Sequence, residues 1–394
     1  MVRISRAARA LAQQTVAPFR KRRDRPAVRG LVAFLVVWSV AACAAQSPPV
    51  TLGARAAPST ESATPSAGSS SPSDDRSRPA PKPAPRGAEP GTSRNTARGT
   101  ATLAFAGDVH FEGVSARALT QSWGSAGKVL AGADLAIVNL ETAVTRRGTP
   151  APKQYTFRAP GSAFDALRSA GVDAVTLANN HGMDYGAPGL QDTLATASAH
   201  SMPLLGAGAT QRQAFAPMRR TVNGVHIAVL AATDVLDTFA QDAWVAGPTK
   251  PGLASSKDPA RLLAAVRAEA AHADVVVVYL HWGQELTVCP TARQRQLATL
   301  LAKAGADLVV GSHAHVPQPG ERLGHAYVDY GLGNFVFYAH TPATQRTGVL
   351  TVDVGTDGVH STRWQPATIQ DGLPVLDRGQ AKVQALRLHD QPHC

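Results

Sequence analysis

Short apolar runs alternate with helical stretches from Ala101 onward, and this pattern constrains the fold more than any other feature. Runs of Val, Ile, Leu and Ala bounded by turn residues are typical of strands that are buried on both faces. Their alternation with helical stretches is typical of βαβ units. The sequence therefore predicts one α/β domain over residues 101–394, with strands at 101–106, 135–138, 174–177, 274–280 and 308–310.

The segments between these runs predict helices, one clear hairpin and one irregular stretch. Helices are expected at residues 114–131, 163–170, 190–200, 261–271, 293–304 and 380–388. Asn223-Gly224 lies between two strand-like runs and predicts a two-residue hairpin turn. Residues 234–251 have no regular pattern, and we expect a lid or substrate loop there.

Each of the five apolar runs ends at its carboxyl side in polar side chains. These are Asp108 and His110, Asn139 and Glu141, Asn180 and His181, His281, and His313 and His315. Taken singly, each has an ordinary explanation: a helix cap, a turn residue or a hydrogen-bonded core histidine. Ligands of α/β proteins bind at the carboxyl ends of parallel strands, so the five ends together predict a binding site.

The residue types at these strand ends favour metal binding. Imidazole with carboxylate and amide oxygen suits Mn, Fe or Zn, and the lack of clustered cysteines argues against a structural zinc site. The donors are too many for one ion, so we expect two divalent ions about 3.5–4 Å apart that share a carboxylate. Such a pair would bind a phosphate-like oxyanion and lower the pKa of a bound water.

The positive charge of the chain is confined to its N-terminal region. Residues 1–29 carry nine Lys or Arg against one acidic residue, and residues 44–100 carry seven against four. These two segments account for the whole net charge of +11. We therefore predict no nucleic-acid partner for the folded domain.

The N-terminal region predicts export. The apolar run of residues 31–42 is too short to span a bilayer comfortably but suits a signal peptide, and it ends at Cys43 in a lipobox-like sequence. The prediction is a lipid-modified Cys43; an ordinary signal peptide or an uncleaved anchor is the alternative. Residues 44–100 are rich in Pro, Ser and Ala and predict a disordered tether. The sequence thus predicts a signal peptide with a lipobox over residues 1–43, a tether over 44–100 and a folded domain over 101–394. The protein is expected at the extracellular face of the cell membrane.

Two cysteines remain after Cys43, namely Cys289 and Cys394. In an oxidising compartment they could form a disulfide, but two separate thiols are an equal alternative, because the sequence does not show that the chain end reaches Cys289.

The strand-end motifs resemble those of a known family. The motifs are Gly107-Asp108-x-His110, Asn139-Leu140-Glu141, Asn179-Asn180-His181, His281-Trp282-Gly283-x-Glu285, Gly311-x-His313-x-His315-x-x-Gln318 and Gly333-Asn334-Phe335-x-Phe337. Over residues 102–337 the sequence is similar to the bacterial CapA-type capsule and poly-γ-glutamate synthesis family, within the calcineurin-like metallophosphoesterase superfamily. The resemblance implies a four-layer α/β/β/α sandwich with a dinuclear site between its sheets.

The resemblance also implies a role for each strand-end residue. Asp108, His110 and His315 would hold one ion, and Asn180, His281 and His313 the other. Glu141 stands where the superfamily has a bridging Asp, a departure that leaves bridging open, and His181 would protonate the leaving group. Supporting roles next to the ligands are implied for Asn139, Asp184 and Glu285.

The resemblance implies an exported protein that helps to make, anchor or export a capsular polymer such as poly-γ-glutamate, with a hydrolase site of metallophosphoesterase type. The expected partners are a polyanionic polymer or a phosphoester, the membrane and other capsule-synthesis proteins. Two alternatives stay open: an assembly factor that uses bound metal to hold a polyanion without catalysis, and a hydrolase that trims the polymer.

Overall fold

The computed structural model describes residues 99–389 and Cys394. The predicted signal peptide, the lipobox cysteine Cys43 and nearly all of the predicted tether lie outside these residues. Within the described part, no helix combines the length and apolar character needed to cross a membrane.

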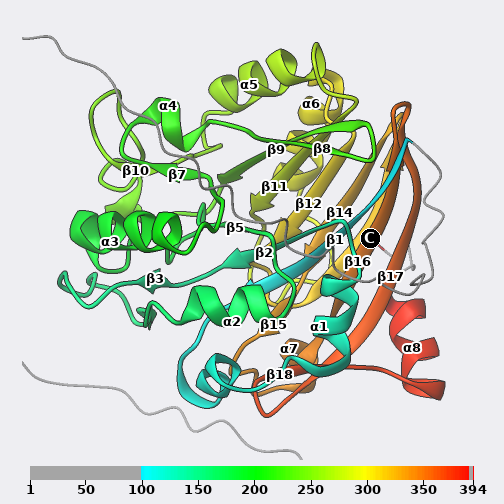
Figure 1. Cartoon of the computed structure of the whole chain (residues 1–394), viewed down its shortest axis with the longest axis horizontal. Coiled ribbons are helices and arrows are strands. Elements are labelled where there is room, and N and C mark those ends of the chain that lie inside the picture. Colours follow the sequence, from blue (N-terminus) through cyan, green and yellow to red (C-terminus); the bar gives the residue numbers. More distant parts are fainter. Residues whose placement is uncertain (1–98, 390–393) are drawn as a thin grey trace, which may run out of the picture. The chain divides into compact units, whose positions relative to one another are not determined.

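The first sheet contains the N-terminal strands of the domain and a returning C-terminal hairpin (Figure 1). Its order is β18-β17-β16-β1-β2-β5-β6, and β15 also pairs with β1. Strands β1, β2, β5 and β6 are parallel, whereas β16, β17 and β18 add antiparallel neighbours. The bounds are β1 Thr100–Val109, β2 Leu135–Leu140, β5 Ala174–Thr176, β6 Leu204–Leu205, β15 Asn334–Val336, β16 Arg346–Gly355, β17 Gly358–Gln370 and β18 Leu373–Leu376.

The second sheet has the order β13-β14-β12-β11-β9-β8. Strands β9, β11, β12 and β14 are parallel, and β8 and β13 pair antiparallel at the two edges. The bounds are β8 Met218–Val222, β9 Val225–Thr233, β11 Val275–His281, β12 Leu308–Ser312, β13 Pro317–Leu323 and β14 Ala326–Leu332. All seven residues of β11 are buried, as expected of a central parallel strand covered on both faces.

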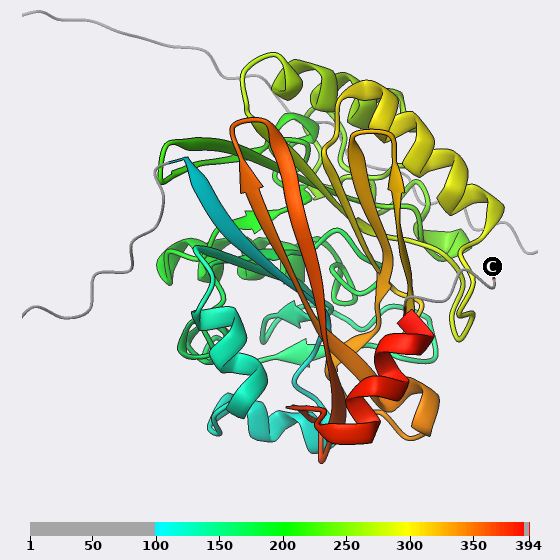
Figure 2. The ribbon, with the colours of Figure 1, turned by 90° about the vertical axis from the view of Figure 1, so that its right-hand side faces the viewer.

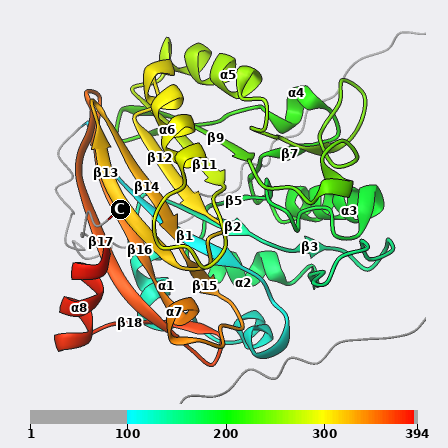
Figure 3. The same cartoon turned by 180° about the vertical axis from the view of Figure 1, so that it is seen from behind.

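The two sheets pack face to face, and helices cover their outer faces (Figures 1 and 3). Alternate residues of each strand, such as Leu103 and Phe105 of β1 and Val277 of β11, form the core between the sheets. Helices α1 Gly124–Ala131, α2 Ala163–Ser169 and α3 Gly186–Ala199 pack on the first sheet, and α5 Ala260–Ala270 and α6 Ala292–Ala304 on the second. The predicted four-layer α/β/β/α sandwich is therefore confirmed.

The smaller elements connect or flank these layers. Their bounds are η1 Gly113–Leu119, β3 Ala143–Val144, β4 Arg158–Ala159, β7 Ala207–Gly208, α4 Gln211–Ala214, η2 Thr238–Ala240, β10 Gly252–Leu253, α7 Pro342–Gln345 and α8 Gly379–His389. Figure 2 shows α8 beside the long β16–β17 hairpin, which runs along β1.

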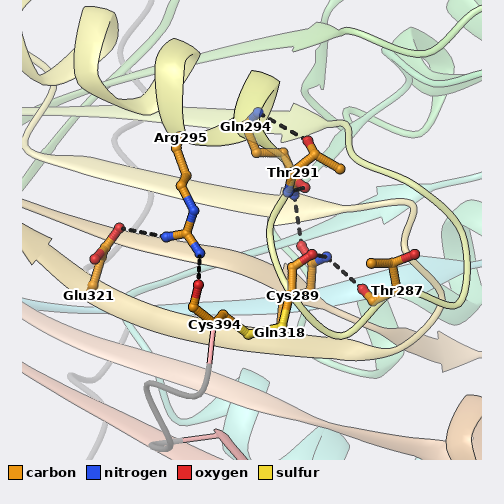
Figure 4. The surroundings of a disulfide bond; sticks show 8 residues. All are labelled: Thr287, Cys289, Thr291, Gln294, Arg295, Gln318, Glu321 and Cys394. Atoms are coloured by element: carbon orange, nitrogen blue, oxygen red, sulfur yellow. Dashed lines mark hydrogen bonds and ion pairs between the residues drawn. A yellow bond between two sulfur atoms is a disulfide. The ribbon is translucent and has the colours of Figure 1, made fainter.

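Three local expectations have a clear outcome. The hairpin turn at Asn223-Gly224 is confirmed, and both residues have the positive φ angles, 51° and 90°, that such a turn requires. The single helix predicted for residues 114–131 is wrong: residues 120–123 separate η1 from α1, and α1 begins at Gly124, which has a φ of 57°. The cysteine pairing left open by the sequence is a disulfide between Cys289 and Cys394 (Figure 4).

The parallel strands of both sheets bring their carboxyl ends to one place. In the first sheet, Asp108 of β1 is in register with Asn139 of β2 and with Asn334 of β15. In the second, His281 of β11 is in register with Ser312 of β12. The sheets meet where Asn139 Nδ2 lies 3.2 Å from His281 Nδ1, so the predicted site residues lie between the two sheets.

Candidate metal centre

Asp108 is the fixed point of the site. Its carboxylate is fully buried, accepts a hydrogen bond of 2.8 Å from Asn139 Nδ2 and accepts one of 3.2 Å from the backbone N–H of His313. The preceding Gly107 makes this placement possible, because a Cβ there would lie 1.8 Å from the carbonyl oxygen of Gly333. The glycine thus lets β1 approach the chain just before β15 and brings Asp108 close to Asn334.

Glu141 carries the strongest sign of a missing cation. It follows β2 and is fully buried, yet neither carboxylate oxygen has a hydrogen-bond partner among the described residues. The His281 ring lies beside it, with Nε2 3.5 Å from Glu141 Oε1. Burial and the charge of Asp108 raise the pKa of Glu141 well above its ordinary value. A buried carboxylate without partners is costly, so this position favours a bound cation.

His313 and His315 follow β12 in a strained backbone. Their φ angles are 92° and 56°, in the left-handed region that non-glycine residues rarely adopt. Such residues cost about 1–3 kcal/mol each and cluster at functional sites. Two contacts stabilise this strained backbone: the hydrogen bond from the His313 N–H to Asp108, and a contact of 2.8 Å between His315 Nδ1 and Asn334 Oδ1.

The described side chains form three groups of metal-binding donors. Within each group one donor atom of every residue lies within 4.8 Å of the others: Asp108, Glu141 and His315; Glu141, His281 and His313; and Glu285, His313 and His315. Glu141 belongs to two of the groups, which is the position a shared carboxylate would take. The structure thus brings together six of the residues that the sequence singled out.

The charge distribution of the site is that of a cation receptor. Burial opposes protonation of His315, but Glu141 and Asp108 outweigh it and raise the pKa of His315 to about 10. Burial and neighbouring histidines instead hold the pKa values of His281 and His313 well below the ordinary value. These two imidazoles are neutral at physiological pH, and the neutral ring is the form that binds metals.

His281 contacts polar side chains at the strand ends of both sheets. Its Nδ1 lies 3.0 Å from Ser312 Oγ, and its Nε2 lies 2.8 Å from Asn180 Oδ1. Asn139 holds this arrangement, because it contacts Asp108 and His281 and accepts a bond of 2.9 Å from Asn179. Asn139 therefore holds the ligand candidates in position and is not itself a ligand candidate, which is the supporting role predicted for it.

His110 lies apart from the three donor groups. Its Nε2 is buried and has no hydrogen-bond partner among the described residues. Its Nδ1 lies 3.0 Å from Ser115 Oγ, whose hydroxyl donates to Glu112 O and so offers a lone pair to the ring. The Glu112 N–H donates to the same Nδ1 at 3.2 Å. Both polar contacts that the described residues make with the ring are therefore at Nδ1, and Nε2 is the nitrogen left for a metal.

His181 has a carboxylate partner and a nearby cation. Its Nδ1 lies 2.7 Å from Asp184 Oδ2, and Asp184 Oδ1 lies 2.8 Å from the Lys153 ammonium. The Phe157 ring stacks on His181 at 4.1 Å and contacts His110 at 4.6 Å. Sequence reasoning missed Lys153 and Phe157, since both lie in the loop between β3 and β4, where no strand end or periodic pattern marks them.

The residues present fit divalent metal ions. Unpartnered buried atoms occur on Glu141, His110 and His313, all of which the sequence nominated as ligands. Together with Asp108, His281 and His315 they form a mixed imidazole and carboxylate set, which suits Mn, Fe or Zn.

Fold and site together define a class of protein. It is a four-layer α/β/β/α sandwich with a site of histidines and carboxylates between the carboxyl ends of its two sheets. Within this class, the chain belongs to the family described as bacterial capsule synthesis protein PGA_cap, whose model matches residues 102–339. The family predicted from the strand-end motifs is thereby confirmed.

Individual relatives carry related names. The chain is 33% identical over 240 residues to the PGA biosynthesis protein CapA of Bacillus subtilis, covering 60% of this chain and 62% of that protein. It is 33% identical over 227 residues to the capsule biosynthesis protein CapA of Bacillus anthracis, covering 57% and 54%. The chain thus spans less than two thirds of these relatives. It is also similar to the crystal structure of a novel phosphatase from Mycoplasma pneumoniae, with 14% identity and a TM-score of 0.44 over 73% of this chain and 99% of that one.

Proposed function

We propose that this protein is an exported, surface-tethered capsule-synthesis protein whose folded domain is a metal-dependent hydrolase of phosphoester type. Its substrate belongs to the making, anchoring or export of a capsular polymer such as poly-γ-glutamate. Family membership supports the pathway, and the basic N-terminal segment with its apolar run and Cys43 supports export. One observation carries the catalytic part: the fully buried Glu141 carboxylate, unpartnered among the described residues and shared by two donor groups.

Side chains at the strand ends of the two sheets would form two sets, and each set would hold one divalent ion. Asp108, His110 and His315 would hold one, and Asn180, His281 and His313 the other, and Glu141 would serve one ion or both. Bound divalent ions would supply the binding of an anionic substrate oxygen and a lowered pKa for a coordinated water.

His181 would handle the proton of the leaving group. The Asp184 carboxylate accepts from Nδ1 and so holds a ring proton there, which leaves Nε2 as the nitrogen that receives or delivers the catalytic proton. Burial lowers the pKa of His181, although Asp184 opposes this effect. Lys153, on the other side of Asp184, holds that carboxylate in place.

A combined measurement of metal content and turnover tests this proposal. Purified full chain is loaded with Mn or Zn, analysed for bound metal, and assayed with a generic phosphodiester and with poly-γ-glutamate. We expect close to two ions per chain, metal-dependent turnover of the phosphodiester, and in His181→Ala a loss of turnover with unchanged metal content. Asp371→Asn, which changes an exposed carboxylate outside the site, is the matched control.

Each other outcome points to a different conclusion. Less than one ion per chain after loading would refute the dinuclear site. Full metal content without turnover of either substrate, combined with polymer binding, would favour the non-catalytic assembly factor. Cleavage of poly-γ-glutamate alone would favour the polymer-trimming hydrolase.

A further inference from the structure

The loop between β11 and α6, residues 282–291, brings a third carboxylate to the site. Glu285 is exposed, and its carboxylate lies within 4.8 Å of ring nitrogens of His313 and His315. We propose that Glu285 is itself a metal ligand, on the solvent side of the site, and that the Cys289–Cys394 disulfide holds it there. This inference rests on the proposed metal site and gives Glu285 a direct role in place of the supporting role expected from the sequence.

The two histidines near Glu285 point to a metal-binding role for its carboxylate. Among the described residues its carboxylate makes no hydrogen bond and no ion pair, although two histidines lie within reach. His313 is almost fully buried, and its Nδ1 has no hydrogen-bond partner in the described part of the chain. The charge of Glu285 also acts on Glu141, so Asp108, Glu141 and Glu285 place like charges around the same small region. A divalent cation between them would remove that repulsion.

Few interactions hold the outer part of the 282–291 loop. The N–H of Leu286 donates to Ala314 O at 2.8 Å, and Gln318 Nε2 donates to Thr287 O at 2.7 Å. Apolar burial contributes little, because Leu286 and Val288 are 65% and 55% exposed. Leu286 also has a φ of 58°, a strained value for a side chain of this size. A longer hydrogen bond of 3.4 Å joins Gln318 Nε2 to Cys289 O, and the disulfide at Cys289 adds a covalent tie.

The disulfide supplies that tie four residues after Glu285. It joins Cys289 to the last residue of the chain, and Arg295 of α6 donates to the carbonyl oxygen of Cys394 at 2.9 Å (Figure 4). The loop is thus fixed to the helix that follows it through the chain end. Without the bond, the Glu285 carboxylate would sample more positions, and its effective concentration at the histidines would fall.

A set of variants of the full chain tests the coupling between Glu285 and the disulfide. The set is wild type, Glu285→Gln, the pair Cys289→Ser with Cys394→Ser, the combination of all three, and the control Asp371→Asn. Mn²⁺ affinity is measured by competition with a chelating dye, at a temperature where circular dichroism shows every variant folded. We expect Glu285→Gln and the serine pair each to weaken binding by about tenfold, and the combination to be no weaker than Glu285→Gln alone.

The results separate this inference from the proposed function. If wild type binds no metal, the proposed metal site fails and Glu285 falls with it. If wild type binds and Glu285→Gln binds equally well, the metal site stands and Glu285 is not a ligand. If the serine pair lowers the melting temperature but leaves the affinity unchanged, or weakens binding equally in the Glu285→Gln background, the disulfide does not act through Glu285.

Discussion

Replacing Glu141 by Gln should stabilise the metal-free protein and remove most of its stabilisation by metal. The carboxylate is fully buried and makes no hydrogen bond among the described residues, and burial raises its pKa despite the opposing charge of His315, so its charge opposes folding when no metal is bound. Glutamine keeps the shape of the side chain and removes the charge. The same change takes away the one carboxylate that belongs to two of the three groups among the described residues, so metal binding should weaken sharply.

The structure sets the size of both effects. An unsatisfied buried polar group costs about 1–3 kcal/mol, and because the new amide is also unpartnered, we expect a net gain of about 1 kcal/mol. For a large domain this raises the melting temperature by about 2–4 °C. Metal at 100 times Kd stabilises wild type by about 2.7 kcal/mol, whereas a 100-fold weaker variant at the same concentration gains about 0.4 kcal/mol.

The stability difference between metal-free Glu141→Gln and wild type should depend on pH. Because the pKa of Glu141 is raised in the folded state, its contribution to stability is complete below the ordinary glutamate pKa and is lost as pH rises through the raised value. Metal-free Glu141→Gln has no carboxylate at this position, so its stability does not decrease with pH for this reason. The difference in melting temperature between variant and wild type should therefore grow as pH rises.

Differential scanning calorimetry with and without Mn, at several pH values, measures these quantities. The reasoning would be refuted if metal-free Glu141→Gln melted below wild type at neutral pH, or if Mn raised the melting temperature of both proteins equally.

Three further predictions concern single residues. Lys153→Met should lower turnover at unchanged metal content, because the Lys153 ammonium holds Asp184, the partner of His181. Lys153→Arg keeps the charge and should retain part of the turnover. Steady-state kinetics with elemental analysis checks this, and loss of metal would contradict it. Ser115→Ala should weaken Mn binding about tenfold, because it removes a contact that orients the His110 ring. Dye competition measures this, and an unchanged affinity would mean that Ser115 only packs. Cys43→Ala should shift the protein from the membrane fraction to the medium on immunoblots, and retention in the membrane would argue for an uncleaved anchor.

The strand-end residues were accessible to sequence reasoning because they follow a rule of chain geometry. Parallel strands place their carboxyl ends at one edge, so Asp108, Glu141 and His281 could be assigned to a common place from the apolar runs alone. The hairpin at Asn223-Gly224 was predictable for a similar reason, since only certain residues adopt its φ angles.

Other features depend on where loops return in space, which no local pattern encodes. Lys153 and Phe157 lie in a connection without periodicity, and only tertiary packing brings them to His181. The pairing of Cys289 with Cys394 depends on the chain end passing α6. The break in the expected helix over residues 120–123 was also missed, because the isolated Gly124 after it does not by itself predict the end of a helix.

The pairing of β1 with β16 has a consequence for the order in which the domain is completed. Thr100 is in register with Gly355, and Phe105 with Leu350, so the first strand of the domain has one of its neighbours among the last. During synthesis from the N-terminus, β1 would have an open edge until residue 346 and those after it have emerged. A chain cut short before that point would retain every proposed metal ligand and still expose this edge. Aggregation through this edge, rather than a missing metal ligand, would then prevent such fragments from being studied as metal-binding proteins.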